Sequence, residues 1–268
     1  MYFGYYYSKL ELEQLFKSVY KFEGQYRNSI VYKHPEYNLS IKEIKCEEEF
    51  PNNIQDTKNS LGWTELYFVN LLSEYPNFVN YKGYHFNGKQ LYIITEWVPN
   101  STTLCDYLEQ PRDFLECFQV LLQVFICLEI LYKKFGIVHN DCIPSNIILE
   151  KTEYKPDKYF IFCFENKMYY IKDMGYKVYL WDYSFCKNDK VSFFNLGSIL
   201  KTVSSGKEIP EKFIDMTRLS TCLLYEKYQN NMFYCIVKNW LYRYFYTNTL
   251  AGMCVKPSSA NDFHYIKY

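Results

Sequence analysis

Two short segments near the front of the chain alternate apolar and polar residues. They are SIVYKH at 29–34 and LSIKEIK at 39–45. Because successive side chains of a strand point to opposite faces, this period of two predicts two strands, each with one buried face. The continuous apolar run QLYIITEWV at 90–98 predicts a strand that is buried on both faces. We therefore expect a sheet in the front part of the chain.

Two longer segments have a helical period. Apolar residues three apart in LGWTELYFVNLLSEYPN, at 61–77, predict a helix that Pro76 stops. Residues 113–136 place apolar side chains at i, i+3 and i+4, which predicts a long amphipathic helix with Gly136 as its C-cap. The front of the chain thus combines several strands with one main helix.

Shorter elements follow the long helix. Residues 147–150 and 177–183 each predict a strand, and residues 159–172 predict a hairpin with its turn near 165–167. The pattern after Asn188 is helical.

The change from strands to helices predicts an α+β fold with two lobes. We expect a small β-rich N-terminal lobe at 1–96 and a mostly helical C-terminal lobe at 97–268. The joint lies near 97–101, where Pro99 and the run NSTT interrupt the pattern.

Composition narrows the class of protein. Apolar residues make up 49% of the chain, which supplies a sizeable core and argues against disorder. Because 30 basic residues balance 30 acidic ones, charge gives no evidence for nucleic-acid binding or for an anionic membrane. The ten cysteines form no CxxC pair and lie scattered in apolar stretches, which predicts reduced core thiols.

Targeting signals are not evident in the sequence. The first residues lack the basic start and the cleavage site of a signal peptide. The longest apolar stretch, 120–132, is too short to span a bilayer. We therefore expect an intracellular protein without a membrane-spanning segment.

Polar side chains gather in GIVHNDCIPSNIILE at 136–150. Phosphoryl transfer needs cations for the phosphates, oxygen ligands for a metal and an oriented base for the acceptor hydroxyl. Asp141 could be the base, while Asn146 and Asp182 could offer oxygen ligands to Mg²⁺. A structural reading stays open, because an Asp and an Asn five residues apart also form turns and a strand-end Asp also forms caps.

The order of these residues resembles the protein kinase superfamily. LSIKEIK is similar to the strand that carries the phosphate-binding lysine, here Lys42, although Lys42 could also be a solvated strand lysine. TELYFVNLL is similar to the helix whose glutamate, here Glu65, pairs with that lysine. HNDCIPSN is similar to the catalytic loop, which implies Asp141 as base and Asn146 as metal ligand, and Asp182 opens a triplet in the place of Asp-Phe-Gly.

The resemblance covers most of residues 22–200 and implies ATP and Mg²⁺ as cofactors. LYIITEWV is similar to the strand that enters the hinge, with Thr95 behind the adenine. The implied metal ligands are Asn146 and Asp182. The implied ATP-binding positions are Gly24, Val31, Ser40, Lys42, Thr95, Glu96, Val98 and Ile148.

A narrower resemblance lies between Asn146 and Asp182, a stretch that is long for a kinase. Together with the triplet Asp-Tyr-Ser at 182–184 it is similar to the insert and triplet of haspin-like kinases, and related inserts occur in kinases of large DNA viruses. Heavy use of Tyr, Asn, Lys and Ile also indicates an AT-rich genome. A viral protein of this kind would act in the host cytoplasm or nucleus.

Other positions depart from the kinase pattern. EGQYRNSIVY retains Gly24, but Tyr26 and Ser29 stand where glycines let backbone amides approach phosphates. Asn140 replaces the Arg that pairs with a phosphate on the activation loop, so we expect no activation by phosphorylation there. Ile143 replaces a phosphate-facing Lys.

The segment after the triplet departs most. Ser184 replaces the triplet's Gly, which stiffens the backbone. Six residues separate Asp182 from Asp189, and KVSFFNLGSIL at 190–200 is similar to the long buried helix of the C-terminal lobe. The resemblance then implies a greatly shortened activation segment, with Asp189 bonding the backbone of the catalytic loop. His139 is also expected to be structural.

Three functions stay open. An ATP–Mg²⁺-dependent Ser/Thr protein kinase of divergent, haspin-like type explains the retained positions and implies an unknown protein substrate. A pseudokinase that binds nucleotide without transfer explains the poor glycine loop. A small-molecule phosphotransferase, similar to aminoglycoside or choline kinases, shares the loop and lacks an activation segment.

Overall fold

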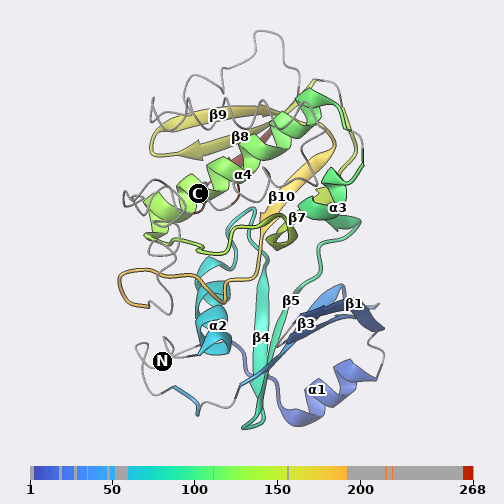
Figure 1. Ribbon diagram of the computed structural model, residues 1–268, viewed down its shortest axis with the longest axis vertical. Coiled ribbons are helices and arrows are strands. Elements are labelled where there is room, and N and C mark those ends of the chain that lie inside the picture. Colours follow the sequence, from blue (N-terminus) through green and yellow to red (C-terminus); the bar gives the residue numbers. More distant parts are fainter. Residues whose placement is uncertain are drawn as a thin grey trace. The chain divides into compact units, whose positions relative to one another are not determined.

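The computed structural model describes most of the first 191 residues and little after them (Figure 1). The chain forms two compact units, one from residues 1–99 and 182–194 and the other from residues 100–181 and 195–268. The described residues are 3–17, 20–26, 29–34, 36–46, 49–51, 60–110, 112–155, 157–191, 215, 219 and 262–267, with the backbone alone in 20–26 and 262–267.

A five-stranded antiparallel sheet forms the first unit (Figure 1). The strand predictions at 29–34, 39–45 and 90–98 are confirmed by β2, β3 and β5, whereas β1 and β4 were not predicted. The strand order is β1-β2-β3-β5-β4. The bounds are β1 Tyr20–Tyr26, β2 Ser29–His34, β3 Leu39–Lys45, β4 Tyr81–Phe86 and β5 Gln90–Glu96.

Helix α1, Lys9–Phe16, covers one face of this sheet. Its first turn is closed by a capping box, in which Ser8 and Glu11 each bond the other's backbone N–H. Its buried Leu12 packs with Ile94 of β5. The pattern of apolar residues did not predict this helix, although the Ser8–Glu11 spacing is a helix-start signal.

Helix α2, Leu61–Leu72, covers the opposite face. A Cβ atom on Gly62 would lie 3.3 Å from the side chain of Leu91, so the helix approaches β5 closely. Leu91 lies three positions from the β5 residue that packs on α1, and residues an odd number apart in a strand point to opposite faces. The helix prediction is confirmed, but the helix ends before Ser73 and not at Pro76.

The N-terminal segment runs beside β4 and reaches α2. Tyr7 N–H donates to the Tyr84 carbonyl at 2.7 Å, and Tyr84 N–H donates to the Tyr5 carbonyl at 2.9 Å. Phe3 is buried and stacks on Trp63 of α2, with ring centroids 6.1 Å apart. The segment therefore closes the edge of the sheet and packs against the helix that carries Glu65.

Two three-stranded sheets form the second unit. Their orders are β10-β7-β6 and β11-β8-β9, with β11 parallel to β8. The hairpin prediction is confirmed, because Glu165 and Asn166 form its turn with φ of 48° and 58°. The bounds are β6 Ser101–Thr103, β7 Ile147–Lys151, β8 Lys158–Phe164, β9 Lys167–Lys172, β10 Tyr176–Leu180 and β11 Asp262–Lys267.

Helix α4, Phe114–Phe135, packs along the strands of the second unit. Gln123 holds β10, because its amide donates to the Tyr176 carbonyl at 2.9 Å and accepts from Val178 N–H at 3.2 Å. Gly136 ends the helix with φ of 64°, which confirms the predicted C-cap. This unit also contains helix α3, Leu104–Leu108, and the 3-10 turn η2, Pro144–Asn146.

Helix α4 is long and apolar enough to cross a membrane by length and composition alone. The apolar stretch at 120–132 is the central part of this 22-residue helix, and the expectation of no membrane-spanning segment stays a prediction. Within its most apolar window, 67% is buried inside the protein.

The helical reading after Asn188 was wrong in part, because β11 at Asp262–Lys267 is a strand. Asp215 and Leu219 are helical. The predicted helix at 190–200 lies outside the described residues except for its first two positions. Among the described residues, the seven cysteines are free thiols and five of them are buried, as expected for core cysteines.

Gly83 allows the N-terminal segment to approach β4. Its φ is 154°, and a Cβ atom there would lie 2.6 Å from the Tyr5 carbonyl oxygen. We predict that Gly83→Ala raises hydrogen exchange in residues 3–7 and lowers the free energy of unfolding by about 1–2 kcal/mol more than Gly88→Ala. Gly88 is the matched control, because its φ is 91° and a Cβ atom added there would meet no described atom within 4 Å. Equal effects of the two variants would contradict the proposed close approach.

Candidate active site

A buried ion pair lies between the sheet and α2 of the first unit. Lys42 Nζ on β3 lies 2.7 Å from both Oε1 and Oε2 of Glu65 on α2. Both residues are at least nine-tenths buried. The solvated alternative for Lys42 is therefore wrong, and the sequence prediction that these two side chains meet is confirmed.

Asp182 joins this pair. Its Oδ1 lies 3.2 Å from Lys42 Nζ, and its side chain is 20% exposed. Asp182 has φ of 60°, a left-handed conformation that is uncommon for residues other than glycine. The Ser184 hydroxyl reaches both Asp182 Oδ1, at 2.7 Å, and Glu65 Oε2, at 2.8 Å. Four side chains thus form one closed cluster.

Burial strengthens the electrostatic interactions between the charged groups of this cluster, because little water separates them. Burial alone would lower the pKa of Lys42, but the carboxylates of Asp182 and Glu65 outweigh it and raise the pKa to about 12. Burial raises the pKa of Glu65, and the negative charge of Asp182 adds to that effect, against the pull of Lys42. Lys42 is therefore a fixed cation at neutral pH.

The predicted catalytic loop lies in the second unit. The amide nitrogen of Asn146 donates to the Asp141 carbonyl at 2.9 Å and to Asp141 Oδ2 at 3.1 Å. These bonds use the nitrogen, so the amide oxygen of Asn146, the atom that a metal would take, is not part of them. Ile143 N–H closes the turn on the Asp141 carbonyl. The pair five residues apart is thus held in contact.

Trp181 ties β10 to the same loop. Its indole N–H donates to the Ser145 carbonyl at 3.2 Å, and its backbone N–H donates to the Asn146 carbonyl at 3.3 Å. Its own carbonyl oxygen lies 3.1 Å from Nε2 of the buried His139. His139 has the structural position expected for it, and Trp181 precedes Asp182 in the chain.

Asp215 anchors the loop in the role that the sequence reading assigned to Asp189. Its two carboxylate oxygens accept from His139 N–H at 2.6 Å and Asn140 N–H at 2.7 Å. Asp189 is exposed, and Asn140 has φ of 63°, which Asn tolerates. The assignment to Asp189 was wrong. The prediction of a greatly shortened activation segment used Asp189 as its end. Residues 183–214 separate Asp182 from Asp215, most of them lie outside the described residues, and the short segment stays a prediction.

The implied nucleotide positions are spread over both units. Val31 pairs with Lys42 across β2 and β3, and Ser40 pairs with Thr95 across β3 and β5. Val31, Ser40 and Val98 are buried. Gly24 lies in β1 where its pairing with β2 shifts register. Ile148 lies in β7 of the second unit.

Glu96, which the resemblance places in the hinge, already has partners. Its backbone N–H donates to the Asn80 carbonyl at 2.8 Å, and its carboxylate pairs with Lys82. The next amide, of Trp97, donates to the Asn38 carbonyl at 2.8 Å. Neither amide is therefore open to an adenine ring in this arrangement.

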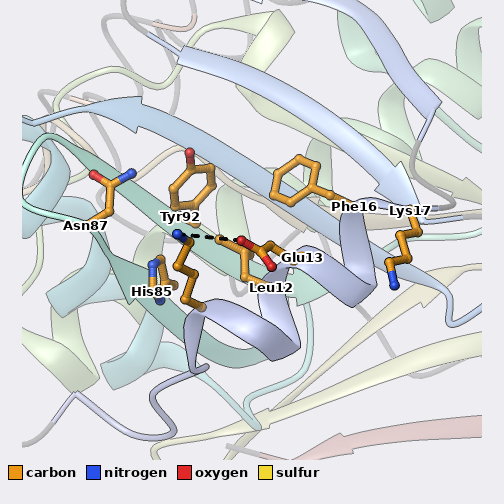
Figure 2. Close-up of a pocket in the computed structure, with 8 residues that line it drawn as sticks. Leu12, Glu13, Phe16, Lys17, His85, Asn87 and Tyr92 are labelled. Carbon is orange, nitrogen blue, oxygen red and sulfur yellow. Dashed lines mark ion pairs between the residues drawn. The ribbon is translucent and has the colours of Figure 1, made fainter.

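A pocket of about 430 Å³ lies between α1 and strands β4 and β5 (Figure 2). Leu12 and Phe16 form its α1 side, and Tyr92 and His85 line its strand side. Tyr92 pairs with the neighbour of Lys42 on β3, so it points to the face of the sheet opposite Lys42. The pocket is separate from the Lys42 cluster.

Comparisons with known proteins add a partial match. No protein-family model matches the chain. Over 106 residues the chain is 31% identical to a protein of Acanthamoeba polyphaga mimivirus named "Putative serine/threonine-protein kinase R400". The match covers 37% of this chain and spans 22% of the length of that relative. It supports a kinase-like relationship over that segment, and the mixed α+β structure is compatible with a two-lobed kinase-like fold.

Removing the buried cation tests the ion pair. We predict that Lys42→Met lowers the free energy of unfolding by about 3–5 kcal/mol, because Glu65 is left as a buried charge next to Asp182. Lys42→Met combined with Glu65→Gln should recover part of that loss. Urea unfolding followed by circular dichroism measures both, and a double variant that is less stable than Lys42→Met would contradict the pair.

Asp215 and Asp189 can be compared directly. We predict that Asp215→Asn lowers the free energy of unfolding by about 2 kcal/mol, because the amide offers one acceptor oxygen to two backbone donors. Asp189→Asn, at an exposed site, should change it by less than about 0.5 kcal/mol. The same unfolding measurement compares them, and equal effects would show that Asp215 is not the anchor.

Proposed function

We propose that this protein transfers the γ-phosphate of ATP, with Mg²⁺, to Ser or Thr hydroxyls of a protein substrate. The observation that carries the proposal is the buried cluster in which Lys42 bonds both oxygens of Glu65 and lies 3.2 Å from Asp182. A buried lysine that is held charged and oriented suits an anionic ligand such as a phosphate. The kinase-like relative supports the same class of reaction.

The proposed roles follow from the atoms that each residue offers. Lys42 binds phosphate oxygens, and Glu65 orients its ammonium group. Asp182 and Asn146 are the proposed Mg²⁺ ligands, because a carboxylate and an amide oxygen are the hard ligands that this ion takes. The ion would neutralise charge on the phosphates. Asp141, oriented by the Asn146 amide, would accept the proton of the substrate hydroxyl.

The finer class that we propose is a divergent, haspin-like kinase that acts inside the cell. The support is the hairpin of β8 and β9, which occupies the interval between Asn146 and Asp182, and the triplet Asp182-Tyr183-Ser184.

A pseudokinase is the second candidate. Its support is Ile143, an apolar residue next to the Asp141–Asn146 pair where a phosphate-facing cation is expected, together with the poor glycine loop around Gly24. Such a protein would bind nucleotide through the Lys42 cluster without transferring phosphate.

Radiolabelled ATP separates these candidates. We predict that the protein with Mg²⁺ labels itself or a mixture of basic and acidic protein substrates, and that Asp141→Asn lowers the rate by about 10²–10⁴-fold because the base is lost. Asp189→Asn is the matched control, since it makes the same chemical change at an exposed position and should retain activity.

The outcomes assign the class. If Asp141→Asn labels as fast as the wild type, the proposed kinase function is wrong. Thermal stabilisation by Mg²⁺–ATP without any labelling would instead support the pseudokinase. Labelling of small aminoalcohols or aminoglycosides but not of proteins would support a small-molecule phosphotransferase.

A further inference from the structure

The Ser184 hydroxyl lies between two carboxylates that come from different elements. Its Oγ is 2.8 Å from Glu65 Oε2 on α2 and 2.7 Å from Asp182 Oδ1. Lys42 Nζ contacts the same two carboxylates from the other side, at 2.7 Å and 3.2 Å. The four side chains form a ring in which a neutral hydroxyl and a cation each bridge the same two acids.

We propose that Ser184 is a positioning residue that couples helix α2 to the proposed metal ligand Asp182. This inference rests on the proposed function, because it assigns Asp182 to the metal. Through its hydroxyl, Ser184 holds Glu65 in its bonds to Lys42 and sets the orientation of the Asp182 carboxylate. A residue of this chain therefore keeps Lys42, Glu65 and Asp182 in contact without a bound ligand.

Electrostatics explains why a bridge is needed here. Glu65 and Asp182 both contact Lys42, and like charges at short range in a site with little water repel. A hydroxyl adds no charge, and its one O–H can donate to Glu65 Oε2 or to Asp182 Oδ1, the two oxygens that Lys42 also contacts. Ser184 therefore lowers the cost of keeping Glu65 and Asp182 near the same lysine.

The backbone of Asp182 gives a second reason. Its φ of 60° is unfavourable for a residue with a Cβ atom and persists only where surrounding contacts fix it. Ser184 supplies two such contacts, since its hydroxyl lies 2.7 Å and its backbone N–H 3.5 Å from Asp182 Oδ1. Lys42 Nζ also contacts Asp182 Oδ1. Because all these contacts are made to Oδ1, they fix the direction in which the second oxygen, Oδ2, points.

Glycine at position 184 could not make this bridge. Among the polar contacts described for Glu65, it would leave those from Lys42, while apolar packing would still hold α2 against the sheet. The loop residue next to Asp141 is Asn140, which carries no charge. The hydroxyl of Ser184 supplies a connection that requires neither ligand nor phosphorylation.

Hydrogen exchange without any ligand tests the link to α2. We expect Ser184→Ala to speed exchange of the Leu61–Leu72 amides by about tenfold or more, because a hydrogen bond to a charged group is lost. Ser184→Thr retains the hydroxyl and should keep exchange within about twofold of the wild type. Ser8→Ala, which removes a serine cap from α1, should affect α1 and leave α2 unchanged. Unchanged α2 exchange in Ser184→Ala would overturn the proposal.

Binding of Mn²⁺ alone, followed by electron paramagnetic resonance, tests the link to Asp182. Asp182→Asn identifies the signal that belongs to this residue. We expect Ser184→Ala to weaken that binding by about fivefold or more, on the scale of one lost hydrogen bond to a carboxylate, and Ser184→Thr to restore it. Faster α2 exchange with unchanged Mn²⁺ binding would overturn the proposal, because Ser184 would then serve stability alone.

These readouts separate the two claims. If the wild-type protein transfers no phosphate, the proposed function fails, while α2 exchange and Mn²⁺ binding still decide the role of Ser184. If phosphate is transferred, Ser184→Ala should raise the Mg²⁺ concentration needed for half-maximal rate, and Ser184→Thr should return it to the wild-type value. An unchanged Mg²⁺ requirement in an active Ser184→Ala enzyme would count against the coupling.

Discussion

The candidate site in the first unit depends on the buried ion pair between Lys42 and Glu65. Both groups lose water on burial, and such a pair repays that loss only when its geometry is strict. Strict geometry requires β3 and α2 to keep a fixed separation. The close approach at Gly62 and the packing of Phe3 on Trp63 both hold α2 against the sheet. Apolar packing thus sets the distance at which the charged pair is stabilising.

Local patterns in the sequence predicted the elements whose own residues show a period. Alternation predicted β2 and β3, and helical spacing predicted α2 and α4 with its Gly136 cap. Strand β4 escaped because YKGYHF has no clean alternation, and its edge is covered by the N-terminal segment, a contact about 80 residues distant in sequence. When the burial of a strand depends on a segment far away in the sequence, the strand's own residues do not show a period that predicts it.

In the candidate site, too, local patterns predicted some residues, and others depend on contacts distant in sequence. Lys42, Glu65 and Asp182 lie in recognisable segments, and the structure brings them together. Asp215 could not be found in this way, because its partners are backbone amides 75 and 76 residues earlier and any helical aspartate would satisfy the pattern. Ser184 was noticed only as a missing glycine. Its hydroxyl acquires a role from Glu65, which lies 119 residues away.

The charge balance of the Lys42 cluster bears on what it binds. Two carboxylates share Lys42 there, so two negative charges lie close together with limited access to water. Burial raises the pKa of Glu65, and repulsion between its carboxylate and that of Asp182 adds to this effect. A divalent cation beside Asp182 would relieve this repulsion, and the added positive charge would then favour phosphate oxygens near Lys42. Under the proposed function, a metal ion beside Asp182 and a phosphate near Lys42 would therefore favour each other's binding.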